Sequence, residues 1–141
     1  MILIHTLRFN MNREIALKVL IAYYKDKSYI NIVLNKELEN RDISREDKNF
    51  ITRIVYGTVQ YQLYLNYLLE PFISGKRVKA YEKMLLLMSL YQHEYMDSIP
   101  DYAIVNEAVQ IAKKQKGIKT ANFINAVLKK AFKEKRSLEE L

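Results

Sequence analysis

The chain has 141 residues, half of them apolar, and a formal net charge of +7 at pH 7. This length fits one domain that folds without covalent cross-links, and the absence of cysteine excludes a disulfide scaffold, a thiolate metal site and a cysteine nucleophile within this chain. No apolar run reaches the roughly 20 residues of a membrane-spanning helix, and the first residues lack a signal-peptide cleavage site, so we expect a soluble, cytoplasmic protein with no membrane partner.

The first part of the chain is predicted to be helical, because three glycines and two prolines leave few interruptions. Residues 1–11 are interpreted as an amino-terminal extension. Asn12 is a candidate cap for a helix that begins at Arg13, and Ser28 is a candidate cap for a second helix that ends in the polar turn 39–42. Apolar residues recur at three- and four-residue spacing in both stretches, which is the pattern of amphipathic helices.

Ser44 followed by Asp47 is a variant of the capping box, and it predicts the start of a long helical segment that continues to Pro71. Gly57 interrupts this segment. A glycine inside a helix costs about 1 kcal/mol relative to alanine, so we expect either another helix that crosses closely at Gly57 or a bend.

A central helix is predicted from Val78 to Tyr95, because residues 84–90 are apolar on all sides. Pro100 fits the first turn of the next helix, and Gly117 ends it. A last helix begins near Thr120, and residues 137–141 are interpreted as a tail or the start of a linker. We therefore predict one all-α domain, an orthogonal bundle of about seven helices over residues 12–136.

Residues that could carry catalysis are sparse. The sequence has no glycine-rich phosphate loop, and His5 and His93 lack the partner four residues away that a zinc-binding helix requires. Asn106 and Glu107 lie beside an apolar helix face, and we expect them to form hydrogen bonds inside the bundle. The sequence therefore predicts no catalytic residue, no metal and no cofactor for this chain.

The basic composition, with a pI near 9.5, is compatible with a polyanion partner. Lysine and arginine gain affinity for nucleic acid by displacing its condensed counterions. An ordinary solvated surface would give the same net charge, so charge alone leaves both interpretations open.

Four segments of the sequence resemble a known family, in the same order along the chain. They read DKNFITRIVYGTVQ (47–60), LLLMSLYQHEYMDSIP (85–100), AIVNEAVQIAK (103–113) and NFINAVLKKA (122–131). Together they make the chain similar, from about residue 12 to residue 132, to NusB-type helical RNA-binding domains. The LYQ and NAVLK motifs are more similar to one branch of that superfamily. This branch comprises the amino-terminal domains of the RsmB/Sun cytosine-C5 methyltransferases that act on small-subunit rRNA. Gln60 and Lys129 depart from this branch, which tends to have arginine at both positions, and this weakens the phosphate contacts expected there.

This resemblance implies RNA binding without catalysis. Methylation at carbon 5 of cytosine needs a thiolate and a pocket for S-adenosylmethionine, so a covalently linked methyltransferase domain would have to supply both. Two alternatives remain: a free-standing antitermination factor that binds nascent rRNA with a small ribosomal protein, and a protein-interaction module without RNA affinity. The candidate rRNA-binding residues are Arg8, Arg13 and Lys18 near the first helix, and Lys113, Lys114, Lys116, Lys119, Lys129 and Lys130 around Gly117.

Overall fold

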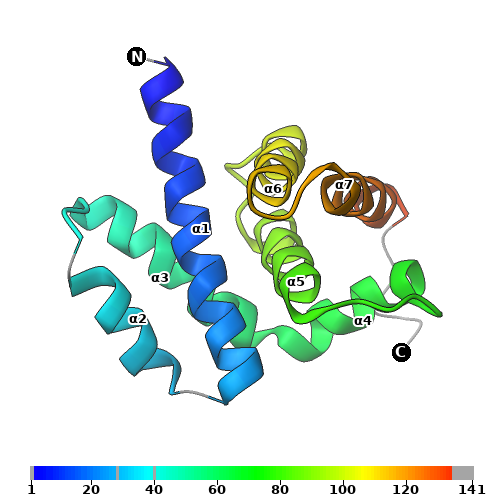
Figure 1. Ribbon diagram of the computed structural model, residues 1–141, viewed down its shortest axis with the longest axis horizontal. Helices are drawn as coiled ribbons and strands as arrows, with labels where there is room; N and C mark the ends of the chain where they lie inside the picture. Colours follow the sequence, from blue (N-terminus) through cyan, green and yellow to red (C-terminus); the bar gives the residue numbers. More distant parts are fainter. Residues whose placement is uncertain (1, 28, 40, 135–141) are drawn as a thin grey trace.

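The computed structural model describes residues 2–27, 29–39 and 41–134, with side chains from residue 11 onward. These residues form seven helices and no strand (Figure 1), which confirms the predicted all-α class. The helices are α1 (Ile2–Asp26), α2 (Ile30–Glu39), α3 (Arg45–Gln60), α4 (Gln62–Ile73), α5 (Ala80–Tyr95), α6 (Asp101–Gln115) and α7 (Ile118–Lys133).

Helix α1 is longer than the sequence predicted. It begins at Ile2 instead of Arg13, so Asn12 lies inside the helix and is 3% exposed. The prediction of a cap at Asn12 is therefore wrong. Residues 2–11 contain neither glycine nor proline, and nothing in them stops a helix that the bundle stabilises from Asn12 onward. The proposed cap at Ser28 lies outside the described residues.

The start of α3 agrees with the sequence pattern. The Ser44 hydroxyl accepts a hydrogen bond from the Asp47 backbone N–H at 3.1 Å, as an N-cap side chain does. The predicted long segment divides into α3 and α4 at Tyr61, and α4 continues through Pro71 to Ile73. Pro71 has no N–H to donate to the Tyr67 carbonyl, but the helix continues for two residues beyond it before ending.

Helix α5 lies at the centre of the bundle. Its residues from Met84 to Gln92 are all buried, and it packs against α1, α3, α4, α6 and α7. Gly57 of α3 lies at the crossing with α5, where a Cβ atom would overlap the Tyr91 ring. The expectation that another helix crosses closely at Gly57 is confirmed, and α3 continues past Gly57 to Gln60.

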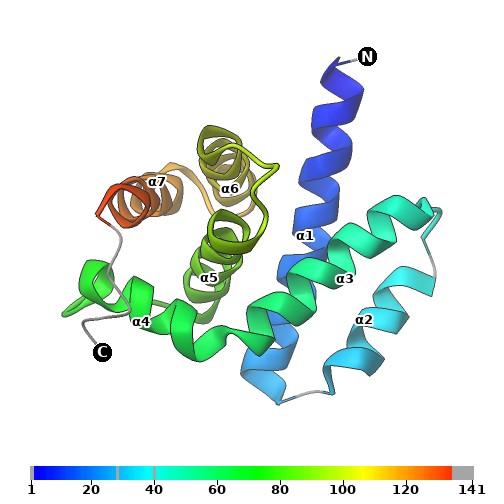
Figure 2. The ribbon, with the colours of Figure 1, turned by 180° about the vertical axis from the view of Figure 1, so that it is seen from behind.

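Helices α6 and α7 form a hairpin that is seen nearly end-on in Figure 1, with the turn between them toward the viewer. From behind, in Figure 2, the start of α6 and the end of α7 face the viewer instead. Gly117 has a φ of 107°, a conformation that glycine adopts without strain, and α7 begins directly after it at Ile118. The two ends of the hairpin thus lie on opposite faces of the molecule.

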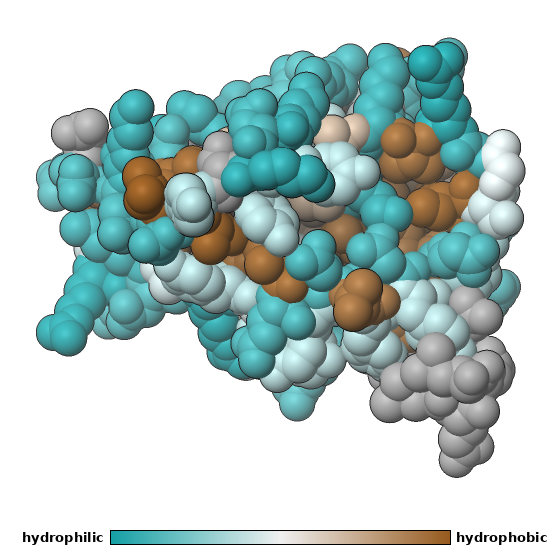
Figure 3. Space-filling view, turned by 90° about the horizontal axis from the view of Figure 1, so that it is seen from below, coloured by the Kyte–Doolittle hydropathy of each residue, from teal (hydrophilic) through white to brown (hydrophobic). Residues whose placement is uncertain are grey.

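Exposed apolar side chains are spread over several elements. On the face shown in Figure 3, hydrophobic residues form separate patches divided by hydrophilic ones. Single exposed apolar residues of this kind are ordinary on protein surfaces. The most exposed are Tyr29, Ile32, Leu63, Tyr102 and Ile118. Within the described part of the chain, no helix combines the length and the apolarity needed to cross a bilayer.

Candidate nucleic-acid interface

Arg13 is buried, and its side chain is 4% exposed. Its Nε donates a hydrogen bond to the Gln92 Oε1 at 2.8 Å, its Nη1 forms an ion pair with the Glu107 Oε2, and its guanidinium lies over the Phe50 ring. Burial lowers the pKa of Arg13 and raises the pKa of Glu107, while the ion pair opposes both shifts. The structure therefore places the Arg13 side chain inside the bundle, in contact with α3, α5 and α6, and not on the surface where a phosphate contact was expected.

The contact between Arg13 and Glu107 also settles the expectation about Glu107. This carboxylate forms its contact inside the bundle and joins α6 to α1, as the sequence indicated. Its neighbour Asn106 is exposed. Gln92, which belongs to the LYQ motif, accepts the second bond from Arg13. This motif residue therefore has a structural role in the core.

Lys114 lies against α1 in the folded chain, one turn from Lys18, although the two lysines are far apart in sequence. The Lys114 ammonium, on α6, donates a hydrogen bond to the Glu14 carboxylate of α1 at 3.0 Å. Lys18 lies one turn further along α1, and its Nζ is 3.0 Å from the Glu37 Oε1. The hydrogen bond from Lys18 lowers the pKa of Glu37, so this carboxylate is ionised at neutral pH. Both lysines remain mostly exposed, and a carboxylate partly compensates each of them.

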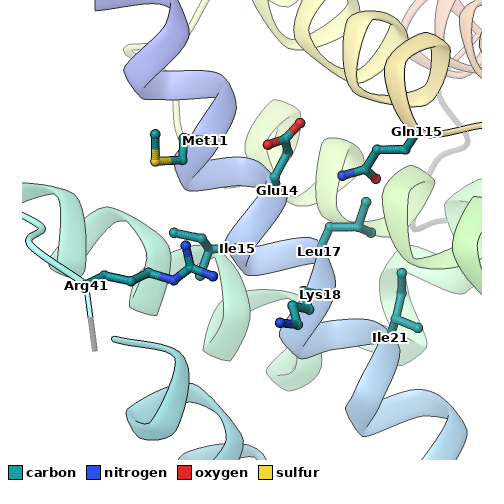
Figure 4. Close-up of a pocket in the computed structure, with 8 residues that line it drawn as sticks. All are labelled: Met11, Glu14, Ile15, Leu17, Lys18, Ile21, Arg41 and Gln115. Carbon is teal, nitrogen blue, oxygen red and sulfur yellow. The ribbon is translucent and has the colours of Figure 1, made fainter. Parts of the chain in front are cut away.

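A hollow of about 310 Å3 lies beside α1 at Glu14 and Lys18, and we call it the α1 hollow (Figure 4). Apolar residues of α1 form part of its wall, whereas Lys18 and Arg41 supply positive charge and Gln115 reaches it from the end of α6. Arg41 also forms an ion pair with Glu37, at 3.1 Å. The lining residues are Met11, Glu14, Ile15, Leu17, Lys18, Ile21, Arg41 and Gln115.

The predicted cluster around Gly117 is divided by the structure. Lys113, Lys116 and Lys119 are exposed at the α6–α7 turn and form no ion pair with any described residue. Lys129 follows Lys119 by ten positions on α7, which is about 15 Å along a helix, so Lys129 and Lys130 lie near the opposite end of the hairpin. The side chain of Arg8 lies outside the described part of α1.

Two lysines that the list of candidates omitted also lie near the turn. Lys25 of α1 and Lys79, which precedes α5, line a hollow together with Lys116. The sequence offers one indication for each of these two lysines. Lys25 follows Lys18 by seven residues and therefore shares a helix face with it, and Lys79 ends the basic run KRVK at 76–79. We call Lys18, Lys25, Lys79, Lys113, Lys114, Lys116 and Lys119 the turn-side lysines.

His93 has an ordinary packing role. Its Nδ1 is 2.6 Å from the Asp101 Oδ1, and its ring stacks on Phe132 with a centroid distance of 4.1 Å. Among the described residues, no group of three or more histidine, aspartate or glutamate side chains could hold a metal ion.

The family of the chain follows from comparison with known proteins. The NusB family model matches residues 10–133. The chain therefore belongs to the NusB family.

Relatives of two kinds share this similarity. The chain is 41% identical over 125 residues to the probable ribosomal RNA small subunit methyltransferase B of Bacillus subtilis (strain 168), a match that covers 86% of this chain and 28% of the relative. It is 30% identical over 127 residues to the transcription antitermination protein NusB of Acetivibrio thermocellus, and this match covers 88% of each. The chain thus spans little more than a quarter of the methyltransferase and most of the antitermination protein.

Solved structures share the fold at low sequence identity. A crystal structure of the antitermination factors NusB and NusE with dsRNA contains a chain that aligns with a TM-score of 0.83 and 18% identity, over 90% of this chain and 97% of that one. NusB of T. maritima aligns with a TM-score of 0.82 and 20% identity, over 94% and 96%. These matches show that the arrangement of the helices is that of NusB.

Proposed function

We propose that this chain is a cytoplasmic RNA-binding domain that directs a covalently linked methyltransferase domain to small-subunit rRNA. The main support is the contact between Lys114 and Glu14, which brings the basic positions of α1 and those of the α6–α7 turn to one side of the bundle. The 41% identity to a probable rRNA methyltransferase favours this branch of the family.

In this proposal the turn-side lysines contact the phosphate backbone. Lysines are compact point charges that bind phosphate without reading the bases, so they position an RNA and leave sequence selection to other contacts. Lys113, Lys116 and Lys119 contribute most, because no carboxylate of the described chain neutralises them. Lys18 and Lys114 contribute less, since a bound phosphate has to compete with Glu37 and Glu14.

The chemistry of methylation belongs to the linked domain in this scheme. Attack on carbon 6 of cytosine requires a cysteine thiolate, and the chain contains no cysteine. The helical domain would raise the local concentration of rRNA near the catalytic domain, as a tethered binding module does.

The test compares two charge reversals that change net charge equally. Lys113→Glu with Lys119→Glu alters the turn side, and Lys129→Glu with Lys130→Glu alters the other end of α7. In filter binding to rRNA fragments across a salt series, we expect the turn-side variant to lose about tenfold or more in affinity near 0.1 M salt and to show a flatter salt dependence. The control should lose clearly less.

Two results would contradict the proposal. Equal losses in the two variants would show that the turn side has no special role and that net charge alone governs binding. A parent chain with no RNA affinity beyond weak charge attraction would favour a protein-interaction module instead.

The second candidate is a free-standing antitermination factor that acts with a ribosomal protein. Its specific support is the match to the Acetivibrio thermocellus NusB protein, which extends over 88% of both chains. Native mass spectrometry after mixing with the small ribosomal protein would show a stable heterodimer in this case. The reading frame after the Leu141 codon also separates the two, because a cysteine-bearing methyltransferase segment there would support the first candidate.

A further inference from the structure

A second hollow, of about 440 Å3, opens where the end of α1, the start of α5 and the α6–α7 turn come together. We call it the lysine hollow. Lys25, Lys79 and Lys116 line it, and each comes from a different element. Its size falls in the range of small-ligand sites, and Glu82 is the one carboxylate among its lining residues.

Among the residues that line the lysine hollow, Glu82 is the only one that carries a negative charge. Lys25, Lys79 and Lys116 are all exposed, and none of them forms an ion pair with a described residue. Like charges that face a common hollow repel one another, and a bound anion would relieve that repulsion. Lysines from three different elements line this one hollow, so a single bound anion can reach more than one of them.

One wall of the hollow is held in place by Tyr81. Its hydroxyl donates a hydrogen bond to the Gln115 Oε1 at 2.8 Å, and the Lys116 ammonium lies over its ring, 4.9 Å from the centroid. Burial raises the pKa of Tyr81 to about 12, so its hydroxyl stays neutral at physiological pH and adds no negative charge. The hydrogen bond between Tyr81 and Gln115 therefore joins the end of α6 to the start of α5.

The start of α5 adds further donors. Residues 79–82 form the beginning of this helix, and Lys79 at the N-cap makes no side-chain capping bond. The first backbone N–H groups of a helix have no intrahelical acceptor and carry partial positive charge. Together with the ammonium groups they offer donors of the kind that bind phosphate oxygens.

We propose that the lysine hollow binds a phosphate group through Lys25, Lys79 and Lys116, and that in the bound complex this is a backbone phosphate of the RNA. The assignment to RNA rests on the proposed function, whereas phosphate binding by the hollow does not.

The position of the hollow fits an extended strand of RNA. Gln115 lines the α1 hollow and also accepts the hydrogen bond from Tyr81 of the lysine hollow, so the two hollows adjoin at this residue. Lys18 and Lys25 lie seven residues apart on one face of α1, about 10 Å along the helix. An RNA backbone held at Lys18 and Lys114 could therefore continue into the lysine hollow.

The first experiment replaces two lysines of the lysine hollow that neither charge-reversal variant changes. The double variant Lys25→Ala, Lys79→Ala is compared with a control, the double variant Lys36→Ala, Lys133→Ala. The control removes the same charge at exposed sites elsewhere. We expect the hollow variant to lose about tenfold in affinity for an rRNA fragment at 0.1 M salt. The plot of the logarithm of the association constant against the logarithm of salt concentration should become shallower, its negative slope decreasing in magnitude by about 1.4. The control should change by less than about twofold. Circular dichroism checks that both variants fold.

A third variant changes binding in the opposite direction. Glu82→Gln removes the carboxylate of the hollow without removing a donor to the ligand, so we expect a severalfold gain in affinity at low salt. A gain cannot result from misfolding, and an unchanged affinity would contradict a phosphate seated beside Glu82.

A titration with inorganic phosphate separates this inference from the proposed function. Amide chemical shifts of residues 79–82 and 116–120 should move in the parent chain and not in the Lys25→Ala, Lys79→Ala variant. If these shifts move but rRNA does not bind, the hollow takes a free phosphate and the RNA function is wrong. If rRNA binds equally well to the hollow variant and the control, and no shift moves, the hollow inference is overturned while RNA binding stands.

Discussion

The guanidinium of Arg13 is enclosed by side chains from three helices, although a sequence pattern had placed it among surface cations. Arg13 shares its helix face with Ala16, Leu17 and Leu20, which are all buried. This spacing is visible in the sequence and indicates burial, but the expected helix start at Arg13 suggested an exposed end. The eleven helical residues that precede Arg13 place it inside α1, so it is not an exposed helix end.

The buried pair allows a direct test of its contribution to stability. Arg13→Ala should lower the free energy of unfolding by about 3–5 kcal/mol, because it leaves the Glu107 carboxylate buried without its partner. The double variant Arg13→Met, Glu107→Leu should recover most of the loss, since neither charge remains. Urea denaturation followed by circular dichroism measures both. A single variant as stable as the parent would mean that water reaches Glu107 freely.

At the scale of elements, the helices and those ends that a cap, proline or glycine marks could be predicted, whereas the start of α1 and the break between α3 and α4 could not. Periodic apolar residues and the Ser44 cap identified the segments, because these features act within one helix. The break at Tyr61 has no glycine or proline to mark it. It follows from the way α3 and α4 pack separately against α5, which is information that a local pattern does not contain.

The crossing of α3 and α5 gives a prediction at this scale. Gly57→Ala should destabilise the chain by about 1–3 kcal/mol, because the added methyl group would overlap the Tyr91 ring and force it to move. In a Tyr91→Ala background the same change should stabilise the chain by about 1 kcal/mol, through the higher helix propensity of alanine.

A double-mutant cycle by chemical denaturation measures this reversal of sign. If Gly57→Ala stabilises the chain in both backgrounds, the close approach of the Tyr91 ring does not limit the residue at position 57.

At the scale of the whole molecule, composition predicted the class of fold but could not predict which cations share a surface. Lys114 meets α1 at Glu14 only because α6 packs beside α1 in the folded bundle. The prediction groups Lys119 and Lys129 in one cluster, although their ten-residue spacing on a single helix already places them about 15 Å apart. The nine candidate residues therefore mix surface lysines with a buried arginine, and they leave out Lys25 and Lys79, which line a hollow with Lys116.

Salt should affect binding and stability very differently. Raising NaCl from 50 to 200 mM should weaken binding to an rRNA fragment by an order of magnitude or more, because released counterions drive association. The melting temperature should change by only a few degrees, since the core is apolar and its ion pair is poorly screened. Parallel filter binding and thermal melts test this, and a large loss of stability with salt would show that exposed charges hold the bundle together.

The hairpin of α6 and α7 lies beside α5 and runs from one face of the molecule to the other, with its turn on one face and its open end on the opposite one (Figures 1 and 2). A nucleic acid held at the turn would leave Tyr102, Lys129 and Phe132, which line a hollow at the open end, uncovered. Two different ligands could then occupy the domain at the same time without competing.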